Sequence, residues 1–547
     1  MASEEQKKVI DSIGGISVSA APGSGKTWTA ARLFVNRVRS VVNKRRGVAL
    51  LSYTNVAVGE FKKQIQLLDS SLDVDSVNYI GTIDSFFEQF VISRFFYLIP
   101  GVTRRPRCGR IGKKPWLQIP ASYIDGKRPG DLDHVRCDYK SGRIVYKFKQ
   151  SEYDVTGITL PDQIVHSLFM RAIVECYRYT HEMRWFLAAE ILRNKVVRRL
   201  LGNRFAEIII DEAQDTKGCA FMLFEYIRKA CAFPINISLI GDINQSIYSF
   251  AGAAPDVYMR VVEYWQLKPY RISLNRRCSV NVVEGVKRFF GGEMKAVSDN
   301  KGNGVYYIES SVYEKLDNLT ISRHFGVPSQ NVVVLSRHVV GGKVSPYLKQ
   351  LFEICIERDI KKNLKASCER LLDFIKLYGE VVEDESTANV LLRLAWLVCK
   401  DKKALPPLHT PWAEWRMAVK NTLRCISDSI NVKDLGCAKL IKPRQMPDNC
   451  LISDYLQCYS EIKTVHSVKG ESHDGVIFID KDYTWVKFIQ YKPVGDYIVD
   501  EDLRIMYVAM TRARKFVLLV IPDDVVLRHR AKIEKKVVRL KFEELAL

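Results

Sequence analysis

The sequence predicts an α/β fold with parallel sheets, and three segments carry this prediction. Residues 15–42 combine a short apolar strand (GISVS), a glycine-rich turn and a stretch with helical spacing. Residues 205–211 contain an apolar run (EIII) that ends in acidic residues, and residues 237–242 contain another (ISLI) followed by Gly-Asp. Strands that end at polar turns and alternate with helical segments are typical of parallel sheets covered by helices.

The bulk composition favours a large, basic, multidomain protein. A chain of 547 residues is long enough for about two to four domains. Its formal net charge of +21 favours a polyanionic partner, nucleic acid above all, although general solubility charge is the alternative. The 13 cysteines include no C-x-x-C pair, so we expect reduced thiols rather than a disulfide framework or a zinc site. No apolar run has membrane-spanning length and no signal peptide precedes the first strand, so we expect a cytoplasmic protein.

The turn at residues 21–27 (APGSGKT) has the composition of a phosphate-binding loop. Gly23 and Gly25 allow successive backbone N–H groups to point at phosphate oxygens, and the following helix adds the partial positive charge of its N-terminus. Lys26 is expected to reach the β- and γ-phosphates, and the Thr27 hydroxyl is expected to ligate Mg²⁺. Ala20 stands where the loop pattern has its first Gly. The predicted nucleotide-binding residues of this segment are Ala21, Pro22, Gly23, Ser24, Gly25, Lys26, Thr27 and Trp28.

A phosphate-binding loop needs a second metal-binding carboxylate, and the acidic segment at residues 205–215 (FAEIIIDEAQD) supplies it. Asp211, at the end of the apolar run, is expected to be the second protein ligand of Mg²⁺. Glu212 is expected to orient or deprotonate the attacking water. Taken alone, these acids could simply cap a strand. Together with the phosphate loop they predict an enzyme that hydrolyses a nucleoside triphosphate with Mg²⁺.

The string DEAQD resembles superfamily 1A helicases of the UvrD/Rep/PcrA type, and further motifs of that family follow in order. They are SEEQKKVI (3–10), LLSYTNVAVGEFKKQI (50–65), GTIDSFFEQF (81–90), ISLIGDINQSIYSFAGA (237–253), LNRRCS (274–279), TVHSVKGESHDGVIFI (464–479) and DLRIMYVAMTRARK (502–515). So many motifs in the family order make the resemblance specific. It implies two RecA-like motor lobes and ATP as the nucleotide.

The resemblance assigns further residues to the nucleotide site. It implies that Gln6 reads adenine and that Gln245 senses the γ-phosphate. It places Arg277 and Arg512 on the second lobe, where a guanidinium can stabilise transition-state charge once the lobes close. For each arginine alone, a surface salt bridge is the alternative. The adenine-stacking aromatic of the family is replaced by Arg276, whose planar guanidinium can also stack on a base.

Other positions depart from the family pattern. Asp84 stands where a His is usual, Ala251 where a basic residue is usual, and the family glutamate of the G-L-E-F string is displaced to Glu471. Glu471 is kept in the predicted nucleotide set. These departures put turnover rate and coupling in doubt, but not the reaction.

The resemblance also implies contacts with single-stranded DNA. Aromatic rings stack on bases of any identity, which suits a motor that moves along a strand. Core packing is the alternative for these rings, and for Tyr248 the two alternatives are equally weighted. The predicted contact residues are Tyr53, Thr54, Asn55, Thr82, Tyr248, Phe250 and His466.

The family architecture divides the chain into two lobes, each with an inserted accessory domain. The predicted divisions are lobe 1A at 1–85 and 201–275, accessory domain 1B at 86–200, lobe 2A at 276–340 and 460–547, and a reduced helical accessory domain 2B at 341–459. Residues 101–150 carry 13 Lys/Arg against 4 Asp/Glu, and residues 137–150 alternate around a Ser-Gly turn as a β-hairpin does. This basic module suits contact with nucleic-acid phosphates, and a solvated face or a docking surface for an acidic protein is equally open.

The leading hypothesis is an ATP-dependent DNA helicase that moves 3′→5′ on single-stranded DNA, in repair or antiphage defence. Short members of this family occur beside OLD-family nucleases in Gabija antiphage systems, and the compact size and the VKGESHD string resemble the helicase component of those systems. The resemblance therefore implies a separate GajA-like nuclease partner. The alternative is a DNA-sensing NTPase that regulates a nuclease with little unwinding, and translocation on RNA is the least favoured hypothesis.

Overall fold

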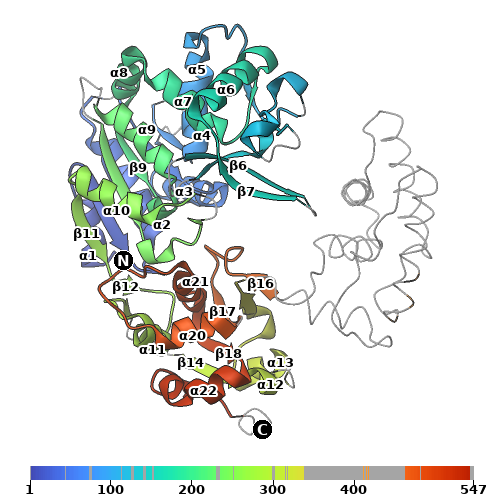
Figure 1. Cartoon of the computed structure of the whole chain (residues 1–547). Coiled ribbons are helices and arrows are strands. Elements are labelled where there is room, and N and C mark those ends of the chain that lie inside the picture. Colours follow the sequence, from blue (N-terminus) through green and yellow to red (C-terminus); the bar gives the residue numbers. More distant parts are fainter. Residues whose placement is uncertain are drawn as a thin grey trace. The chain divides into compact units, whose positions relative to one another are not determined.

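The computed structural model describes residues 2–337 and 462–541, together with the isolated positions 411, 414 and 417. Short gaps within these ranges fall at 44, 73–76, 113, 125–128, 139–142, 151–152, 230–234, 250–251, 298–301, 314–315, 317 and 481. The chain forms two compact units (Figure 1). The first unit comprises residues 1–305, 486–516 and 531–538, and the second comprises the rest.

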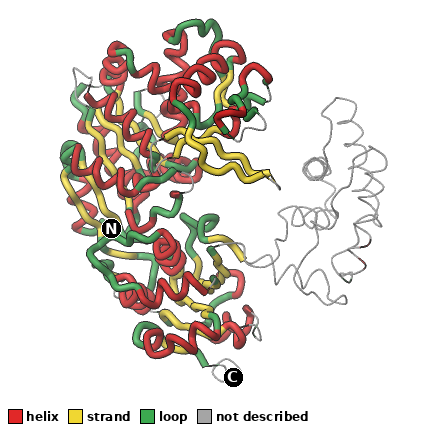
Figure 2. The backbone as a smooth tube through the Cα atoms, viewed as in Figure 1, coloured by secondary structure: helices red, strands yellow, loops and turns green. Residues whose placement is uncertain are grey.

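A six-stranded parallel sheet forms the centre of the first unit, in the order β11-β1-β10-β9-β2-β3. Its strands are β1 (Ile16–Ala20), β2 (Gly47–Ser52), β3 (Tyr79–Thr82), β9 (Phe205–Ile210), β10 (Asn236–Gly241) and β11 (Lys268–Ile272). Figure 2 shows these strands flanked by helices. The flanking helices are α1 (Glu4–Ile10), α2 (Lys26–Ser40), α3 (Asn55–Leu68), α9 (Gly218–Lys229) and α10 (Pro255–Tyr264).

Side chains that point alternately to the two faces of the central strands are buried on both faces of this sheet. Ile209 of β9 packs with Phe34 of α2 in one hydrophobic cluster. Ile208 and Ile210 pack in the other cluster, with Phe221 of α9. A parallel strand that is buried on both faces needs an unbroken apolar run, and this explains the sequence EIII.

The segment between β3 and β9 folds onto the second face of the sheet. It begins with α4 (Ile83–Phe87), which passes through one π-helical turn (Glu88–Ile92) into α5 (Ser93–Phe95). A two-stranded sheet, β4 (Arg107–Cys108) with β8 (Arg178–Tyr179), and the helices α6 (Asp162–Cys176), α7 (Met183–Leu192) and α8 (Lys195–Arg204) follow. Short 3₁₀ turns lie at Phe96–Leu98, Pro115–Leu117, Ala121–Tyr123 and Leu132–His134.

An antiparallel sheet of three strands, β5 (Val135–Asp138), β6 (Arg143–Gln150) and β7 (Tyr153–Thr159), projects from this segment (Figure 1). The pairing of β5 with β6 confirms the hairpin predicted at 137–150. The third strand, β7, was not predicted from the sequence.

The remaining elements are a second sheet, a small strand pair and further helices. The sheet has the order β16-β15-β17-β18-β14-β19, and β15 pairs parallel with both β16 and β17. Its strands are β14 (Gly304–Glu309), β15 (Val332–Ser336), β16 (Ile462–Thr464), β17 (His473–Ile479), β18 (Ala513–Ile521) and β19 (Val538–Arg539). A small pair, β12 (Leu274–Asn275) with β13 (Lys295–Ala296), is separate. The helices are α11 (Val280–Phe290), α12 (Ser310–Tyr313), α13 (Asn318–His324), α20 (Asp482–Gln490), α21 (Glu501–Met510) and α22 (Asp523–Glu534), with a 3₁₀ turn at Ser329–Asn331.

The predicted α/β class with two parallel sheets is confirmed, and β15 confirms the strand expected at 331–338. The segment 341–459, expected to be a helical accessory domain, lies outside the described residues apart from three isolated positions. The predicted boundaries of the lobes and accessory domains remain predictions. Among the described helices, none combines the length and the apolar character needed to cross a membrane.

A buried ion pair connects α2 to β9 near the amino-terminal ends of the strands of the first sheet. Arg37 Nε lies 2.9 Å from Glu207 Oε2, and both side chains are almost fully buried. The Arg37 guanidinium also donates to the carbonyl and hydroxyl oxygens of Ser12, and Glu207 accepts from Ser238 at 2.6 Å. Because the charges are desolvated, removal of one partner leaves the other uncompensated.

We expect Arg37→Met to lower the free energy of unfolding by about 3–5 kcal/mol, because it leaves the buried Glu207 carboxylate without its ion-pair partner. Arg39→Met, two residues along the same helix, is the matched control. Its pair with Asp69 is largely exposed on the arginine side, so a loss below about 1 kcal/mol is expected. Urea unfolding of both variants measures the difference. Equal losses of unfolding free energy would show that the buried pair stabilises the protein no more than the exposed pair does.

Candidate functional site

The predicted phosphate loop lies between β1 and α2, with two glycines in the left-handed region. Gly23 has φ +67° and Gly25, which precedes the first helical residue, has φ +80°. A Cβ at Gly23 would lie 2.6 Å from Arg277 Cβ, so this position excludes any side chain. Lys26 is 8% exposed, and its ammonium donates to the carbonyl of Ala20 at 3.3 Å. The backbone therefore has the curvature that a phosphate cradle requires.

Gln6 braces this loop from α1. Its Nε2 donates to Ser24 O at 3.1 Å and to Thr29 Oγ1 at 3.0 Å. Its Oε1 accepts from Ser3 N at 3.0 Å and from Arg276 Nη2 at 3.3 Å. Both donors and both acceptors of the amide are engaged, so Gln6 connects α1, the loop and Arg276.

Two predicted nucleotide residues flank the brace. The backbone N–H of Arg276 donates to Gly23 O at 2.9 Å, which holds its peptide against the loop. Trp28 is half-buried in the first turn of α2, and the Arg32 guanidinium lies 3.4 Å from its ring centroid. The structure thus brings Gln6, Arg276 and Trp28 to one side of the loop.

The two acids of DEAQD lie where β9 ends. Asp211 is 1% exposed, and its backbone N–H donates to Leu51 O at 2.8 Å. Burial, together with the neighbouring Glu212 carboxylate, raises the pKa of Asp211 well above its usual value, and Lys26 opposes this shift. Glu212 has φ +50°, an unusual conformation for a residue other than glycine, and accepts from Gln214 Nε2 at 2.5 Å.

The donor set fits a magnesium ion shared with phosphates. No side chain among the described residues donates a hydrogen bond to either Asp211 carboxylate oxygen. Ser24 Oγ, in the loop, is likewise buried without a partner. No group of three or more His, Cys, Asp or Glu in the described ranges forms a ready metal cage. Mg²⁺ typically takes one or two protein oxygens and completes its shell with phosphates and water, which a hydroxyl at Thr27 and a carboxylate at Asp211 can supply.

A chain of hydrogen bonds follows the end of β10. Gln245, in the 3₁₀ turn Ile243–Gln245, donates from Nε2 to Asp242 Oδ2 at 2.7 Å. Arg512 Nη2 donates to Gln245 Oε1 at 2.9 Å, and Arg512 is 2% exposed. Burial, then repulsion from Arg277, lowers the pKa of Arg512 to about 9. Arg277 donates to Thr511 O at 3.1 Å, so the two predicted arginines lie close together.

Two residues that hold these groups in place were not predicted. Gln214 Oε1 accepts from Asp242 N at 3.0 Å, and a Cβ at Gly241 would lie 2.4 Å from that oxygen. Asn275 Oδ1 accepts from the backbone N–H groups of Arg277 and Cys278 at 2.7 and 2.8 Å. The signal for Gln214 was its place inside DEAQD, two positions after Glu212.

The predicted DNA-contact residues gather partly at the ends of β2 and β3. Tyr53 and Tyr248 stack on each other, with ring centroids 5.5 Å apart. Burial raises the pKa of Tyr53, and burial, followed by Asp215, raises that of Tyr248 to about 12. Thr82 pairs across the sheet with the residue that precedes Tyr53.

Thr54 and Thr82 also cap helices. Thr54 accepts from Ala57 N at 3.2 Å at the start of α3, where Asn55 is the first residue, and Thr82 accepts from Ser85 N at 3.1 Å. Asp84, where the family has a His, pairs with Arg184.

The remaining predicted residues belong to the second unit or lie outside the described residues. Glu471 belongs to the second unit and forms ion pairs with His473 at 3.2 Å and Lys463 at 3.5 Å. His466 is half-buried beyond β16 in the same unit. Phe250 and Ala251 lie outside the described residues.

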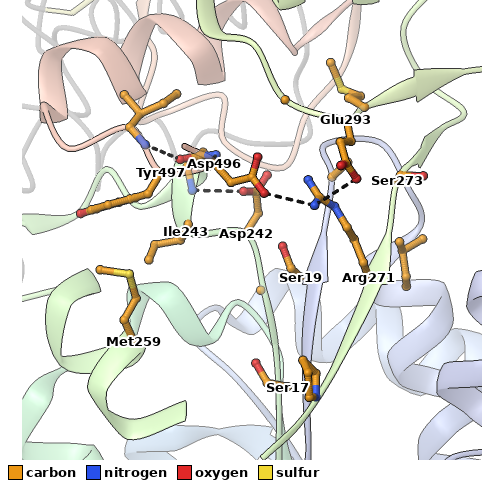
Figure 3. A pocket seen from close by; sticks show the side chains of 18 of the residues that line it. Ser17, Ser19, Asp242, Ile243, Met259, Arg271, Ser273, Glu293, Asp496 and Tyr497 are labelled. Atoms are coloured by element: carbon orange, nitrogen blue, oxygen red, sulfur yellow. Dashed lines mark hydrogen bonds and ion pairs between the residues drawn. The ribbon is translucent and has the colours of Figure 1, made fainter. Parts of the chain in front are cut away.

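A cavity of about 550 Å³ adjoins the carboxyl ends of β1 and β10 (Figure 3). Arg271 lies there between Glu293 and Asp496, at 3.1 and 3.2 Å. Ser19 and Asp242 line the same cavity, whereas Lys26 and Arg512 do not. Ala21, the first residue of the predicted phosphate loop, also lines the cavity, so the cavity adjoins one end of that loop.

A glycine-rich loop after one parallel strand, acids after a second and a glutamine bound to an arginine after a third are typical of P-loop NTPases. Comparison with known families is more specific. Residues 2–100 and 167–265 match the UvrD/REP helicase N-terminal domain, and residues 452–522 match the UvrD-like helicase C-terminal domain. The chain belongs to the UvrD-like helicases.

Individual relatives agree with this family. The Gabija protein GajB of Bacillus cereus is 23% identical over 304 residues, which cover 54% of this chain and 50% of the relative. A probable DNA helicase II homologue of Rickettsia conorii is 22% identical over 268 residues, covering 46% and 38% respectively. One component of the ATP-dependent helicase/nuclease of Exiguobacterium sibiricum is 32% identical over 127 residues, covering 22% of this chain and 10% of the relative. The chain thus matches at most about half the length of these relatives.

We expect Asp211→Asn to stabilise the protein at high pH in the absence of nucleotide and divalent cations. Folding raises the pKa of this carboxyl from 3.8 to about 8, so the folded state keeps a proton that the unfolded chain loses. The stability of the wild type should therefore fall as pH rises from about 4 to about 8. The asparagine variant lacks this loss, and its advantage in melting temperature should grow to several degrees by pH 9.

Thermal melts at pH 5, 7 and 9 measure this difference. Asp215→Asn, four positions along the chain, serves as the comparison variant, because its carboxyl accepts from Gln214 at 3.2 Å. An Asp211→Asn advantage that does not change with pH would contradict the assignment of a buried, unneutralised carboxyl at this position.

Proposed function

We propose that the protein is an ATP-dependent DNA helicase that moves 3′→5′ along single-stranded DNA. The observation that carries the proposal is the contact of Arg512 with Gln245, because it joins a residue beyond α21 to the turn that follows β10. Such a contact can make hydrolysis depend on the geometry of both elements. The family of the chain supports ATP as the fuel.

The nucleotide-contacting groups divide the work of hydrolysis. Lys26 binds the β- and γ-phosphates, and Thr27 and Asp211 hold Mg²⁺. When bound there, Mg²⁺ would neutralise phosphate charge. Glu212 orients or deprotonates the attacking water, as its position after β9 permits. Gln245 senses the γ-phosphate.

Arg277 and Arg512 stabilise the charge that develops on the transferred phosphoryl group. Arg512 is buried, Arg277 is half-buried, and repulsion from Arg277 lowers the pKa of Arg512, so an anion between them would relieve an unfavourable arrangement. The proximity of the two arginines therefore supports a triphosphate as their ligand. Gln6, Arg276, Trp28 and the loop residues complete the proposed set of nucleotide-binding residues, in which Glu471 is kept because of the family resemblance.

Single-stranded DNA is proposed to lie over the ends of β2 and β3. Tyr53, Tyr248 and Phe250 would stack on bases, and Thr54, Asn55, Thr82 and His466 would contact the strand. The stacked pair of Tyr53 and Tyr248 supports this proposal, because half-buried rings at strand ends offer a face to a base. The formal charge of +21 supports a nucleic-acid partner.

The proposed biological setting is antiphage defence with a separate nuclease. The relative named Gabija protein GajB supports this setting, and a GajA-like nuclease of the OLD family is the proposed partner. The proposed division into lobes 1A and 2A with accessory domains 1B and 2B follows the family, as does a cytoplasmic location. A DNA-sensing NTPase with little unwinding is the second candidate, favoured by the departures from the family pattern at Arg276 and Ala251.

The test is ATP hydrolysis with and without single-stranded DNA, together with displacement of an oligonucleotide from 3′-tailed and 5′-tailed duplexes. We expect DNA to stimulate hydrolysis and displacement to require the 3′ tail. Glu212→Gln should lower kcat by about 10²–10⁴-fold and still bind nucleotide, because it removes a general base. Lys26→Ala should lose nucleotide binding as well.

Glu175→Gln, on the exposed side of α6, is the control and should keep wild-type hydrolysis. Hydrolysis without displacement from either tail would favour the regulator. Displacement only from the 5′ tail would contradict the proposed polarity.

Stacking by Tyr53 can be separated from its hydroxyl. Tyr53→Ala should weaken single-stranded DNA binding by about tenfold, because one base–aromatic stack contributes about 1–3 kcal/mol. Tyr53→Phe keeps the ring and should bind within about twofold of wild type. Fluorescence anisotropy with a labelled oligothymidine measures both, and equal losses in the two variants would contradict stacking.

A further inference from the structure

The segment that carries Gln245 is fastened along its length to residues 496–512, and we call this set of contacts the clasp. Asn244 Nδ2 donates to Asp496 O at 2.7 Å, and Asn244 Oδ1 accepts from Ile498 N at 2.8 Å. Further along, Ser249 N donates to Glu501 Oε1 at 3.2 Å. All of these residues belong to the first unit. Figure 3 shows Asp496 and Tyr497 beside Asp242 and Ile243.

Arg504 is the centre of the clasp. It lies in the first turn of α21, and it is 3% exposed. Its Nε donates to Ser246 O at 2.6 Å, and its Nη1 donates to Ile498 O and Val499 O at 2.9 and 2.7 Å. The same nitrogen lies 3.3 Å from the Tyr497 hydroxyl, and the guanidinium faces the Tyr497 ring at 5.8 Å.

The groups that Arg504 contacts are neutral. Within the described ranges, no carboxylate lies within ion-pair distance of its guanidinium. Backbone carbonyl oxygens accept its hydrogen bonds instead. A buried charge that is satisfied only by dipoles contributes little net stability compared with an apolar side chain. Its planar fork, however, fixes the positions of several acceptors at once, as a lysine ammonium does not.

One helix therefore holds two neighbouring residues of the sensing turn. Arg504, near the start of α21, fixes the backbone of Ser246, and Arg512, just beyond its end, contacts the side chain of Gln245. Arg504 does not touch the loop residues that bind phosphate in the proposed site. Its loss would leave the cradle intact and free the turn to move relative to Arg512.

We propose that Arg504 is a positioning residue for nucleotide hydrolysis, which keeps Gln245 in register with Arg512 through the clasp. The inference rests on the proposed ATP hydrolysis and adds a residue that acts without contacting the nucleotide. Such a role affects the rate of hydrolysis rather than nucleotide affinity, because misplacement of reacting groups by about 1 Å can lower the rate about 100-fold. Nucleotide affinity should be spared.

The test uses the full chain with Arg504→Lys and Asn244→Ala. We expect kcat to fall about 10- to 100-fold in Arg504→Lys and less in Asn244→Ala, with ADP affinity within about threefold of wild type. Affinity for ADP with aluminium fluoride, which mimics the transferred phosphoryl group, should fall in parallel with kcat. The double variant should lose less than the sum of the single losses, because both residues hold one turn.

Arg260→Lys, on the exposed side of α10, is the matched control and should behave as wild type. Asn244→Ala guards against misfolding, because it leaves the buried guanidinium satisfied. Unchanged kcat in both variants would overturn the inference, and so would equal losses of kcat, ADP affinity and melting temperature. A wild-type protein that hydrolyses no nucleoside triphosphate would overturn the proposed function, whereas an active wild type with unaffected variants would overturn this inference alone.

Discussion

Strands β1, β10 and β9 run parallel and in register, so their carboxyl ends lie at one edge of the first sheet. This constraint brings the phosphate loop, Asp211 and Asp242 together although long stretches of chain separate them. Apolar runs that are buried on both faces hold the strands, and the ion pair of Arg37 with Glu207 holds the opposite edge. The functional edge can then consist of groups that serve chemistry rather than stability.

Charged groups of both signs are buried at that edge. Burial raises the pKa of both Asp211 and Asp242, and burial lowers the pKa of Arg277 and Arg512. Each shift has burial in a low-dielectric region as its largest cause, because burial disfavours the charged form of the group. Such strain is common at functional sites, and a magnesium ion with a triphosphate would relieve both signs of it at once.

Local sequence could predict the loop at residues 21–27, the acids after β9 and the hairpin of β5 with β6, because spacing and turn chemistry encode them. It could not predict contacts between segments far apart in the chain. Arg504 and Ser246, or Gln214 and Asp242, meet only after the sheets form, and nothing in their local patterns pairs them. Strand β7 was missed because its run, YDVTGIT, contains a Gly and an Asp that weaken a strand pattern. Gln6 was expected to read a base, and its four hydrogen bonds to protein groups could not be seen in the sequence.

The most direct test is an experimental structure of the full chain with a non-hydrolysable ATP analogue and Mg²⁺. The account predicts the triphosphate in the loop between β1 and α2, with Mg²⁺ held by Thr27 and Asp211. It also predicts Gln245 and Arg512 on the γ-phosphate, with Arg504 still bound to Ser246. A nucleotide seated in the cavity beside Arg271, or a γ-phosphate that neither Gln245 nor Arg512 contacts, would contradict the account.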